Sequence, residues 1–340
     1  MDWEMTSLST IVTAIASFAL TAVFGVLLIP FLKRLHFGQS IREDGPTWHK
    51  NKEGTPTMGG LMFVGGISLA VVIGYAVLVM AGKDSVTIDP FETVQIFAGL
   101  IMALLFGLIG FLDDFIKVVK KRNLGLTVWQ KIILQILVTV LYLAALYLGG
   151  DRSTIINVPF LGAWDLGPLY FPILGILIIG IVNSVNLNDG IDGLCGSVTF
   201  VVGIFFMIAT SALGLMGLNV LATALAAGCV GFLLFNAHPA KVFMGDTGSF
   251  FLGGMVVALG FGVNMEFILF FAGFIYCCES LSVLLQILSV KLTGKRLFKM
   301  SPIHHHFEMI GWSENKIVVV FSLVTVVMCV LGFWAVWQIR

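Results

Sequence analysis

Charged residues are what this sequence has least of. They make up 11% of the 340 residues, whereas hydrophobic residues make up 58%, and the mean hydropathy is +1.02. Soluble domains carry about 25% charged residues, so the sequence lies far outside that class. A chain this apolar cannot hide its apolar surface in one water-soluble core, and lipid must solvate it. We therefore expect an integral membrane protein.

Other scarcities exclude further classes. The net charge is zero, which argues against a nucleic-acid-binding protein. The five cysteines are odd in number and lie in or beside apolar runs, which is typical of buried thiols rather than of a disulfide framework. The N-terminus begins with acidic rather than basic residues and continues into a long apolar run. This favours a retained first membrane helix over a cleaved signal peptide.

Long apolar runs fill most of the chain. A membrane-spanning helix needs about 20 mostly apolar residues. Ten runs qualify, at residues 9–32, 59–81, 93–112, 129–149, 169–187, 194–215, 217–236, 248–263, 266–290 and 316–338. The break between the eighth and the ninth rests only on residues 264–266. We expect an all-α integral membrane protein of about ten transmembrane helices, with residues 1–340 forming a single domain.

Positive charge is unevenly divided between alternate loops. Sixteen of the 19 Lys and Arg residues lie in the segments that follow the first, third, seventh and ninth predicted helices. Cytoplasmic loops carry an excess of Lys and Arg, so these loops are predicted to be cytoplasmic and both termini extracytoplasmic. The long loops 33–58, 113–128 and 291–315 are all on the cytoplasmic side of this arrangement, whereas the loops on the other side are short. Because long loops commonly carry function, we expect the functional site to face the cytoplasm.

The first polar motif, LDDFIK, ends the third predicted helix. Charges at membrane depth are costly and usually functional. Asp113 and Lys117 are four residues apart and share a helix face. A solvated helix end with an ion pair would explain this pattern. Paired acids beside a lysine, here Asp113 and Asp114, also suit a divalent cation that binds phosphate oxygens.

The second motif, NSVNLNDGIDGL, lies between the fifth and sixth predicted helices at residues 183–194. It holds three amides, two acids and two glycines, which is more than a plain turn needs. Asp189 and Asp192 can face the same way at this spacing. The glycines permit tight turns and close approach of the backbone to a ligand.

The third motif, FNAHPAKVFMGDTGS, leads into the eighth predicted helix. Asp246, Thr247 or Ser249 could cap the start of this helix. The same position offers free backbone N–H groups to an anion. An aspartate there could instead hold a metal ion against a phosphate.

Two further segments are polar, and one acid lies inside a predicted helix. Three consecutive histidines in SPIHHHFE would point in different directions, so they are poorly suited to a single metal site. They could donate hydrogen bonds to phosphate or shuttle protons. Alternatively, the loop is merely a tolerated polar segment. In KEGTPTMGG, Lys52 and the hydroxyls could contact phosphate, whereas the glycine pair could simply serve helix packing. For Glu279, inside the ninth predicted helix, we favour a hydrogen bond to a neighbouring helix.

Together, these segments resemble the polyprenyl-phosphate N-acetylhexosamine-1-phosphate transferases, in order and spacing, from about Lys52 to Lys316. TPTMGG and SPIHHHFE resemble, within that superfamily, the bacterial phospho-N-acetylmuramoyl-pentapeptide transferases. The resemblance implies Mg²⁺-dependent transfer of phospho-MurNAc-pentapeptide from UDP-MurNAc-pentapeptide to undecaprenyl phosphate, giving lipid I and UMP. This is the first membrane step of peptidoglycan synthesis. It implies a multi-pass protein of the bacterial cytoplasmic membrane, and a homodimer is plausible by the same resemblance.

The resemblance also implies functional residues. The catalytic residues implied are Asp113, Asp114, Asp246, His304 and His305. Asp246 matches the Mg²⁺ ligand of the family, and the implied metal set is Asp246, Asp113, Asp114 and Asn183. The implied substrate-binding residues are Lys52, Thr57, Lys117, Lys121, Lys131, Asn186, Asp189, Gly190, Ile191, Asp192, Asn236, Phe243 and His306.

Two mechanisms and two rival functions stay open on the sequence. Asp113 could remove a proton from the lipid phosphate, which then attacks directly, or a carboxylate could attack first and form a covalent phosphosugar-enzyme. We favour direct attack because a lipid phosphate is already an adequate nucleophile. The nearest rival function is transfer of GlcNAc-1-phosphate to the same lipid. The other rival is an ion-coupled transporter, since acids within membrane helices also suit transport.

Overall fold

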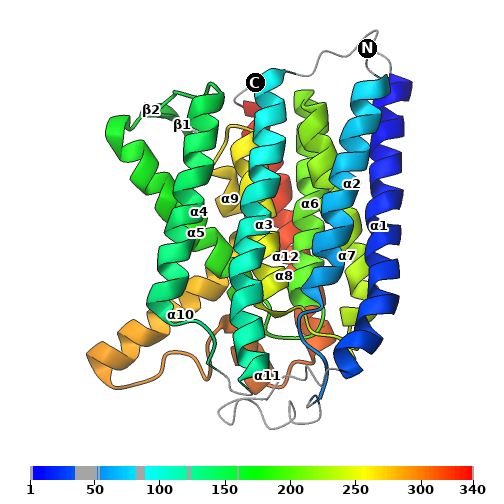
Figure 1. Ribbon diagram of the computed structural model, residues 1–340. Coiled ribbons are helices and arrows are strands. Elements are labelled where there is room, and N and C mark those ends of the chain that lie inside the picture. Colours follow the sequence, from blue (N-terminus) through cyan, green and yellow to red (C-terminus); the bar gives the residue numbers. More distant parts are fainter. Residues whose placement is uncertain are drawn as a thin grey trace.

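The protein is a bundle of long helices (Figure 1). The computed structural model describes residues 3–34, 52, 54–81, 89–120, 124–158 and 161–338. The helices are α1 (Trp3–Arg34), α2 (Gly60–Ala81), α3 (Pro90–Val119), α4 (Val128–Gly149), α5 (Tyr170–Leu187), α6 (Leu194–Leu213), α7 (Met216–Asn236), α8 (Gly245–Gly262), α9 (Ile268–Ala272), α10 (Phe274–Thr293), α11 (Ile303–Met309) and α12 (Glu314–Gln338), with a 3-10 turn η3 (Gly167–Leu169) before α5.

All ten predicted apolar runs form helices, and the eighth differs from the rest. Within the described ranges, nine helices are long and apolar enough to cross a membrane, namely α1 to α7, α10 and α12. The remaining run forms α8, which begins with polar residues and is buried along its whole length from Thr247 to Gly262. Protein rather than lipid surrounds α8, so this helix does not need the continuous apolar surface of the others. The prediction of an all-α membrane protein is confirmed.

The ninth predicted helix, 266–290, is wrong as a single element. It is divided into α9 and α10 at Gly273. A side chain at Gly273 would place its Cβ 2.5 Å from the Leu269 carbonyl oxygen, so the chain bends at a residue that has no Cβ. After the break, α10 runs obliquely away from the bundle (Figure 1).

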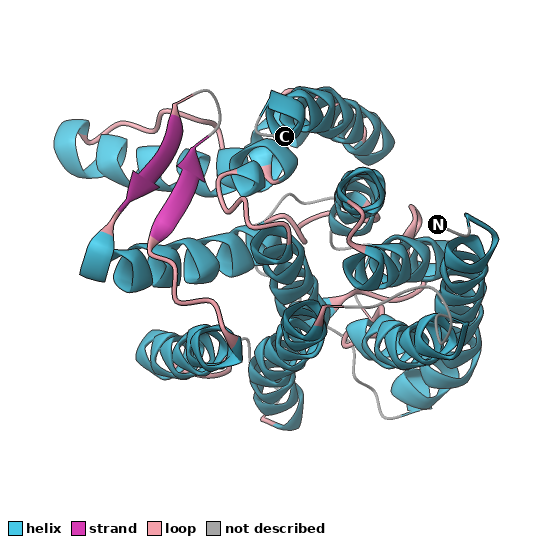
Figure 2. Cartoon of the chain, turned by 90° about the horizontal axis from the view of Figure 1, so that it is seen from above, coloured by secondary structure: helices cyan, strands magenta, loops and turns pink. Residues whose placement is uncertain are grey.

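Two short elements were not predicted. The segment between α4 and α5 forms an antiparallel hairpin of β1 (Ile155–Val158) and β2 (Gly162–Asp165), with Ile155 opposite Asp165. Seen from above, the hairpin lies at the margin of the bundle (Figure 2). The triple-histidine loop forms α11 instead of an irregular segment. The hairpin and α11 lie at opposite ends of the molecule (Figure 1).

Small residues bring α3 and α8 into close contact. A Cβ at Gly110 would collide with the backbone of Asp246, and a Cβ at Gly254 would lie 2.6 Å from the Cα of Ala103. Helices in membranes approach most closely where such residues face each other. The end of α3 therefore meets the beginning of α8. The segment that joins α5 to α6 and the helix α11 are at this same end of the bundle (Figure 1).

The first and last helices have a common orientation relative to this end. α1 begins and α12 ends at the end of the bundle that lies away from α11 (Figure 1). The side of the membrane to which each end belongs stays a prediction.

Candidate active site

Three carboxylates meet where α3 ends and α8 begins. Asp113 and Asp114 come from the last turns of α3, and Asp246 comes from the first turn of α8. One oxygen of each lies within 4.8 Å of the others. The predicted grouping of these acids is therefore present in the fold.

Asp114 holds the start of α8 in place. Its Oδ1 accepts a hydrogen bond from the Asp246 backbone N–H (3.2 Å), and its Oδ2 accepts from the Thr247 N–H (2.9 Å) and hydroxyl (2.7 Å). The first N–H groups of a helix have no partner within the helix, and an acid from α3 supplies one here. The residue before α8, Met244, makes no side-chain cap bond. The sequence suggested that Asp246, Thr247 or Ser249 caps the start of α8. The cap is instead supplied by Asp114 of α3.

Two lysines bind the other two carboxylates. Lys117 Nζ lies 2.6 Å from Asp113 Oδ2 and 3.0 Å from Asp246 Oδ2. Lys131, from the first turn of α4, lies 3.0 Å from each of the same oxygens. Asp113 Oδ1 accepts a hydrogen bond from the Leu126 N–H at 2.7 Å. Three acids with two lysines leave one negative charge, so the cluster favours a further cation.

Of the two predicted asparagines on α5, only Asn186 reaches the carboxylates. Its Nδ2 donates to Asp246 Oδ1 (3.0 Å) and to Ser249 Oγ (2.8 Å). The amide of Asn183 instead exchanges hydrogen bonds with the amide of Gln135 on α4, at 2.9 and 3.3 Å. The structure therefore places Asn186, not Asn183, beside the predicted metal ligands.

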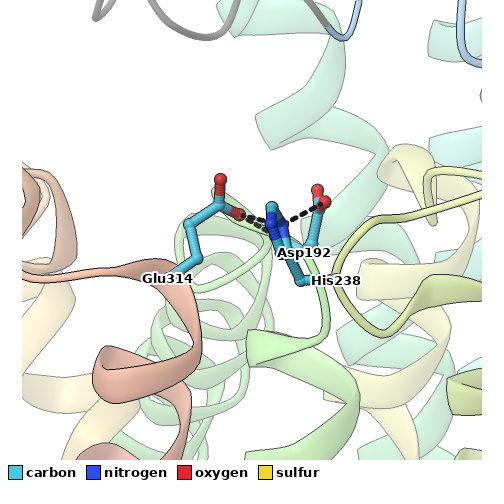
Figure 3. A group of neighbouring side chains, drawn as sticks. All are labelled: Asp192, His238 and Glu314. Atoms are coloured by element: carbon cyan, nitrogen blue, oxygen red, sulfur yellow. Dashed lines mark hydrogen bonds and ion pairs between the residues drawn. The ribbon is translucent and has the colours of Figure 1, made fainter.

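A second polar cluster gathers Lys52, Asp192, His238 and Glu314 from four separate segments. Lys52 Nζ lies 2.8 Å from Asp192 Oδ1 and 2.7 Å from Glu314 Oε1. Asp192 Oδ2 accepts hydrogen bonds from the Ala240 N–H (3.0 Å) and lies 3.1 Å from His238 Nδ1. Figure 3 shows the imidazole between the two carboxylates. Asp192, His238 and Glu314 are close enough together to hold a metal ion. However, the Lys52 ammonium already contacts both acids as their cation.

His238 and Glu314 were not among the predicted site residues. Glu314 stands in the first turn of α12, where an acid is ordinary because it interacts favourably with the positive end of the helix dipole. Nothing in the sequence distinguishes it from such an acid. His238 follows Asn236 in the third motif, and its proximity to Asp192 depends on the fold.

Asn236 and Phe243 hold the loops of this cluster together. Asn236 Oδ1 accepts a hydrogen bond from the Gly193 N–H (3.0 Å), and its Nδ2 donates to the Val242 carbonyl (2.9 Å). The Phe243 N–H donates to the Pro56 carbonyl, and the Phe243 carbonyl accepts from the Gly59 N–H, each at 2.8 Å. The segment before α2 is thus bonded to the segment before α8. Among the other predicted residues, Thr57 and Ile191 are both buried.

The three histidines of α11 point to different partners, as predicted. His304 Nδ1 lies 3.0 Å from Glu279 Oε1, and both side chains are buried. His305 Nδ1 lies 2.6 Å from Glu308 Oε2, and His306 Nδ1 accepts a hydrogen bond from the Lys299 N–H at 3.2 Å. The expected hydrogen bond from Glu279 to a neighbouring helix is therefore present, with α11 as that helix.

Gly190 brings the histidine helix against the second motif. A Cβ at Gly190 would collide with His304 Nε2, so only glycine permits this approach. Next to it, burial and the nearby carboxylates of Asp246 and Asp114 raise the pKa of the Asp189 carboxyl to about 8. Lys121, also predicted, lies outside the described residues.

Two family models match the chain. The one described as Glycosyl transferase family 4 covers residues 96–264. The one described as phospho-N-acetylmuramoyl-pentapeptide-transferase signature 1 covers residues 52–64, the segment that carries Lys52 and pairs with Phe243.

Relatives match over almost the whole chain. The chain is 46% identical over 328 residues to a phospho-N-acetylmuramoyl-pentapeptide-transferase of Heliobacterium modesticaldum, covering 96% of this chain and 97% of the relative. It is 46% identical over 325 residues to the protein of the same name from Acetivibrio thermocellus (94% and 93%), and 44% over 324 residues to that from Bacillus pumilus (95% and 96%). The chain therefore belongs to the phospho-N-acetylmuramoyl-pentapeptide-transferase family, and it is a multi-pass membrane transferase.

Proposed function

We propose that this protein transfers phospho-MurNAc-pentapeptide from UDP-MurNAc-pentapeptide to undecaprenyl phosphate, with lipid I and UMP as products. The reaction takes place at the cytoplasmic face of the bacterial inner membrane and is the first membrane step of peptidoglycan synthesis. The observation that carries the proposal is the cluster of Asp113, Asp114, Asp246, Lys117 and Lys131. Both substrates bring phosphate, and a site of this composition can neutralise phosphate charge.

The donor atoms of this cluster fit Mg²⁺. They are carboxylate oxygens, which hard divalent cations prefer, and they carry one more negative charge than the two lysines balance. Asp246 is the most accessible, since its side chain is 19% exposed, against 1% for Asp113 and 4% for Asp114. We assign Mg²⁺ to Asp246 with Asp113 and Asp114. The bound ion would stabilise the charge of the transferring phosphoryl group.

The lysines have two roles in this proposal. Lys117 contacts all three acids and Lys131 contacts two of them, so the lysines keep three carboxylates close together when no phosphate is present. When the substrates bind, the same ammonium groups are available to phosphate oxygens. Their loss would therefore weaken both the arrangement of the acids and the binding of the donor.

We propose direct attack by the lipid phosphate. One of its oxygens forms a bond to the sugar-linked phosphorus, and the bond from that phosphorus to the oxygen shared with the other phosphate breaks, so UMP leaves. Asp113 would receive a proton only after releasing a lysine, because its Oδ1 accepts from Leu126 and its Oδ2 contacts both lysines. Such a carboxylate is also hindered as a nucleophile. Trapping a phosphosugar adduct on an aspartate without lipid would contradict direct attack.

The nucleotide half of the donor is assigned to the second cluster and its loops. The residues proposed for it are Lys52, Thr57, Asp189, Gly190, Ile191, Asp192, Asn236 and Phe243, together with Asn186, which contacts Asp246 of the carboxylate cluster. His304 lies against Gly190 and joins this region to α11. We assign His304, His305 and His306 to the phosphates of the donor. A homodimer remains a prediction.

The proposal is tested by UMP release from purified full-length protein in detergent, with Mg²⁺, UDP-MurNAc-pentapeptide and undecaprenyl phosphate. We expect release that requires the lipid and is abolished by EDTA. Asp246→Asn should lower the rate about 100-fold or more, as removal of a group that stabilises charge in the transition state does. Asp165→Asn, an exposed change in the hairpin at the other end of the bundle, is the matched control and should retain the wild-type rate.

Replacing the donor by UDP-GlcNAc distinguishes the proposed function from transfer of GlcNAc-1-phosphate to the same lipid. If UMP is released with UDP-GlcNAc and not with UDP-MurNAc-pentapeptide, the site assignment stands and the donor assignment is wrong. If folded protein releases UMP with neither donor, the proposed function is wrong. The match of residues 52–64 to the pentapeptide-transferase signature supports the first donor.

A further inference from the structure

Glu314 links three segments that the sequence keeps far apart. Its Oε1 lies 2.7 Å from Lys52 Nζ, and its Oε2 accepts a hydrogen bond from the Asp192 N–H at 3.0 Å. One carboxylate at the start of α12 therefore holds both the segment before α2 and the loop between α5 and α6. Asp192 contacts Lys52 as well, at 2.8 Å, so the three groups form a closed triangle.

The contacts of Glu314 are shielded from water. The side chain of Glu314 is 10% exposed, that of Lys52 18% and that of Asp192 3%. Exposed ion pairs contribute little, but charge-assisted hydrogen bonds in such a partly buried site are stronger and directional. The position of the Lys52 ammonium is therefore set by two acids together, and Asp192 alone would leave it free to turn about one contact.

The segment that carries Glu314 also packs against the histidine helix α11. Trp312, two residues earlier, packs against Phe307 of α11 with ring centroids 4.6 Å apart, and Phe307 packs against Phe321 of α12 at 5.8 Å. These contacts fix α11 to the beginning of α12. Through Glu314, the same unit is fixed to Lys52 and to the Asp192 loop.

We propose that Glu314 is a positioning residue for the nucleotide half of the donor. It holds Lys52 and the Asp192 loop in the arrangement that receives the nucleotide, and it joins this arrangement to the helix that carries His304. The inference rests on the proposed function, because it takes the donor to be a uridine nucleotide. It assigns a role to an acid that would otherwise only begin a helix.

Binding of UMP to full-length protein, measured by calorimetry in the presence of Mg²⁺, tests the inference. Glu314→Gln should raise the Kd for UMP about tenfold, the effect of losing a hydrogen bond between charged groups. In the UMP-release assay, the KM for UDP-MurNAc-pentapeptide should rise by the same factor. The kcat and the KM for undecaprenyl phosphate should change less than about threefold, since the carboxylate cluster is untouched.

Ser313→Ala is the matched control. Ser313 is exposed, precedes Glu314, and accepts a hydrogen bond from the Lys316 N–H at 3.4 Å, so it supports the start of α12 without contacting Lys52. It should bind UMP with wild-type affinity. If Glu314 served only the helix start, both variants would behave alike. Glu314→Asp keeps the charge at the helix start but is one methylene shorter, so it should fold as the wild type and still bind UMP several-fold more weakly.

A double variant tests the route through Lys52. If Glu314 acts by placing Lys52, Glu314→Gln should weaken UMP binding less than about twofold in a Lys52→Met background. Wild-type affinity in Glu314→Gln and Glu314→Asp, or equal weakening in Ser313→Ala, would overturn the inference. Failure of folded wild-type protein to bind UMP at all would instead overturn the proposed function.

Discussion

The three acids of the carboxylate cluster have different partners. Asp114 uses both oxygens to accept hydrogen bonds from the start of α8, whereas Asp113 contacts Lys117, Lys131 and the Leu126 N–H. Asp246 is the most open of the three to a ligand. Although the sequence presents Asp113 and Asp114 as a pair, Asp114 acts mainly on the backbone of α8.

A variant without the Thr247 hydroxyl tests how much Asp114 stabilises the start of α8. Thr247→Val removes a hydrogen bond of 2.7 Å to a buried carboxylate, and we expect a loss of about 1.5–3 kcal/mol in unfolding free energy. Thermal unfolding followed by tryptophan fluorescence should show a lower midpoint. Thr293→Val, at an exposed helix end, should change stability by less than about 0.5 kcal/mol. Equal midpoints for the two variants would contradict this role.

Residue types were more predictable than their partners. The acids, Lys117 and Lys131 could be assigned to one site from the sequence because the resemblance carries them. The assignment of Asn183 to the metal set was wrong, because Asn186 is the residue that contacts Asp246. The sequence pattern does not separate the two, since residues three apart share a helix face. Which of them meets Asp246 depends on the packing of α5 against α4 and α8. Glu314 was missed because its partners, Lys52 and Asp192, are distant in sequence and an acid at a helix start is common.

At the scale of elements, the site depends on close contact between α3 and α8. Gly110→Ala would push a methyl group into the backbone of Asp246, and overpacking of this kind costs about 1–3 kcal/mol. Because the acids lie on the two helices that would separate, we expect most UMP release to be lost as well. The variant should be compared with wild type in both thermal unfolding and turnover.

Gly180→Ala on α5 is the matched control for that change. A Cβ at Gly180 meets no atom within 4 Å, and alanine favours a helix by up to about 1 kcal/mol over glycine. This variant should keep its activity and unfold at the same or a higher temperature. Full activity in Gly110→Ala would contradict the proposed importance of the α3–α8 contact.

Glu92 stabilises α7 at the other end of α3. Its Oε1 accepts hydrogen bonds from the N–H groups of Gly217 (2.8 Å) and Leu218 (3.0 Å), where α7 begins. Glu92→Ala would leave these buried donors without a partner, so we expect a loss of about 1–3 kcal/mol. Since about 30 Å of helix separates Glu92 from Asp113, the rate of UMP release per folded molecule should not change. A loss of turnover without a loss of thermal stability would contradict this role.

Helices were more predictable than the breaks within them. Runs of about 20 apolar residues determine the spans directly. The apolar run 266–290 contains no polar interruption at Gly273, so its division into α9 and α10 depends on packing that the pattern does not record. The hairpin and α11 are too short and too polar to be detected as apolar runs, so this criterion did not predict them.

For the whole molecule, the orientation in the membrane is the main prediction. The last turns of α1 and α3, which contain Lys33, Arg34 and Lys117, lie at the end of the bundle that carries the carboxylate cluster, whereas α1 begins and α12 ends at the other (Figure 1). A fusion of alkaline phosphatase after Arg340 should be active, and a green fluorescent protein in the same place should be dark. The opposite result would place the carboxylate cluster on the extracytoplasmic side, where a cytoplasmic nucleotide donor could not reach it.

The proposed function requires that the acids at the junction of α3 and α8 hold a divalent cation. Titration of full-length protein with Mn²⁺, followed by electron paramagnetic resonance, tests it without substrates. We predict one site, with affinity reduced about tenfold or more in Asp246→Asn and unchanged in Glu314→Gln, because Glu314 belongs to the cluster around Lys52. Wild-type affinity in Asp246→Asn, or loss of the site in Glu314→Gln, would contradict the assignment of the metal ion to Asp246, Asp113 and Asp114.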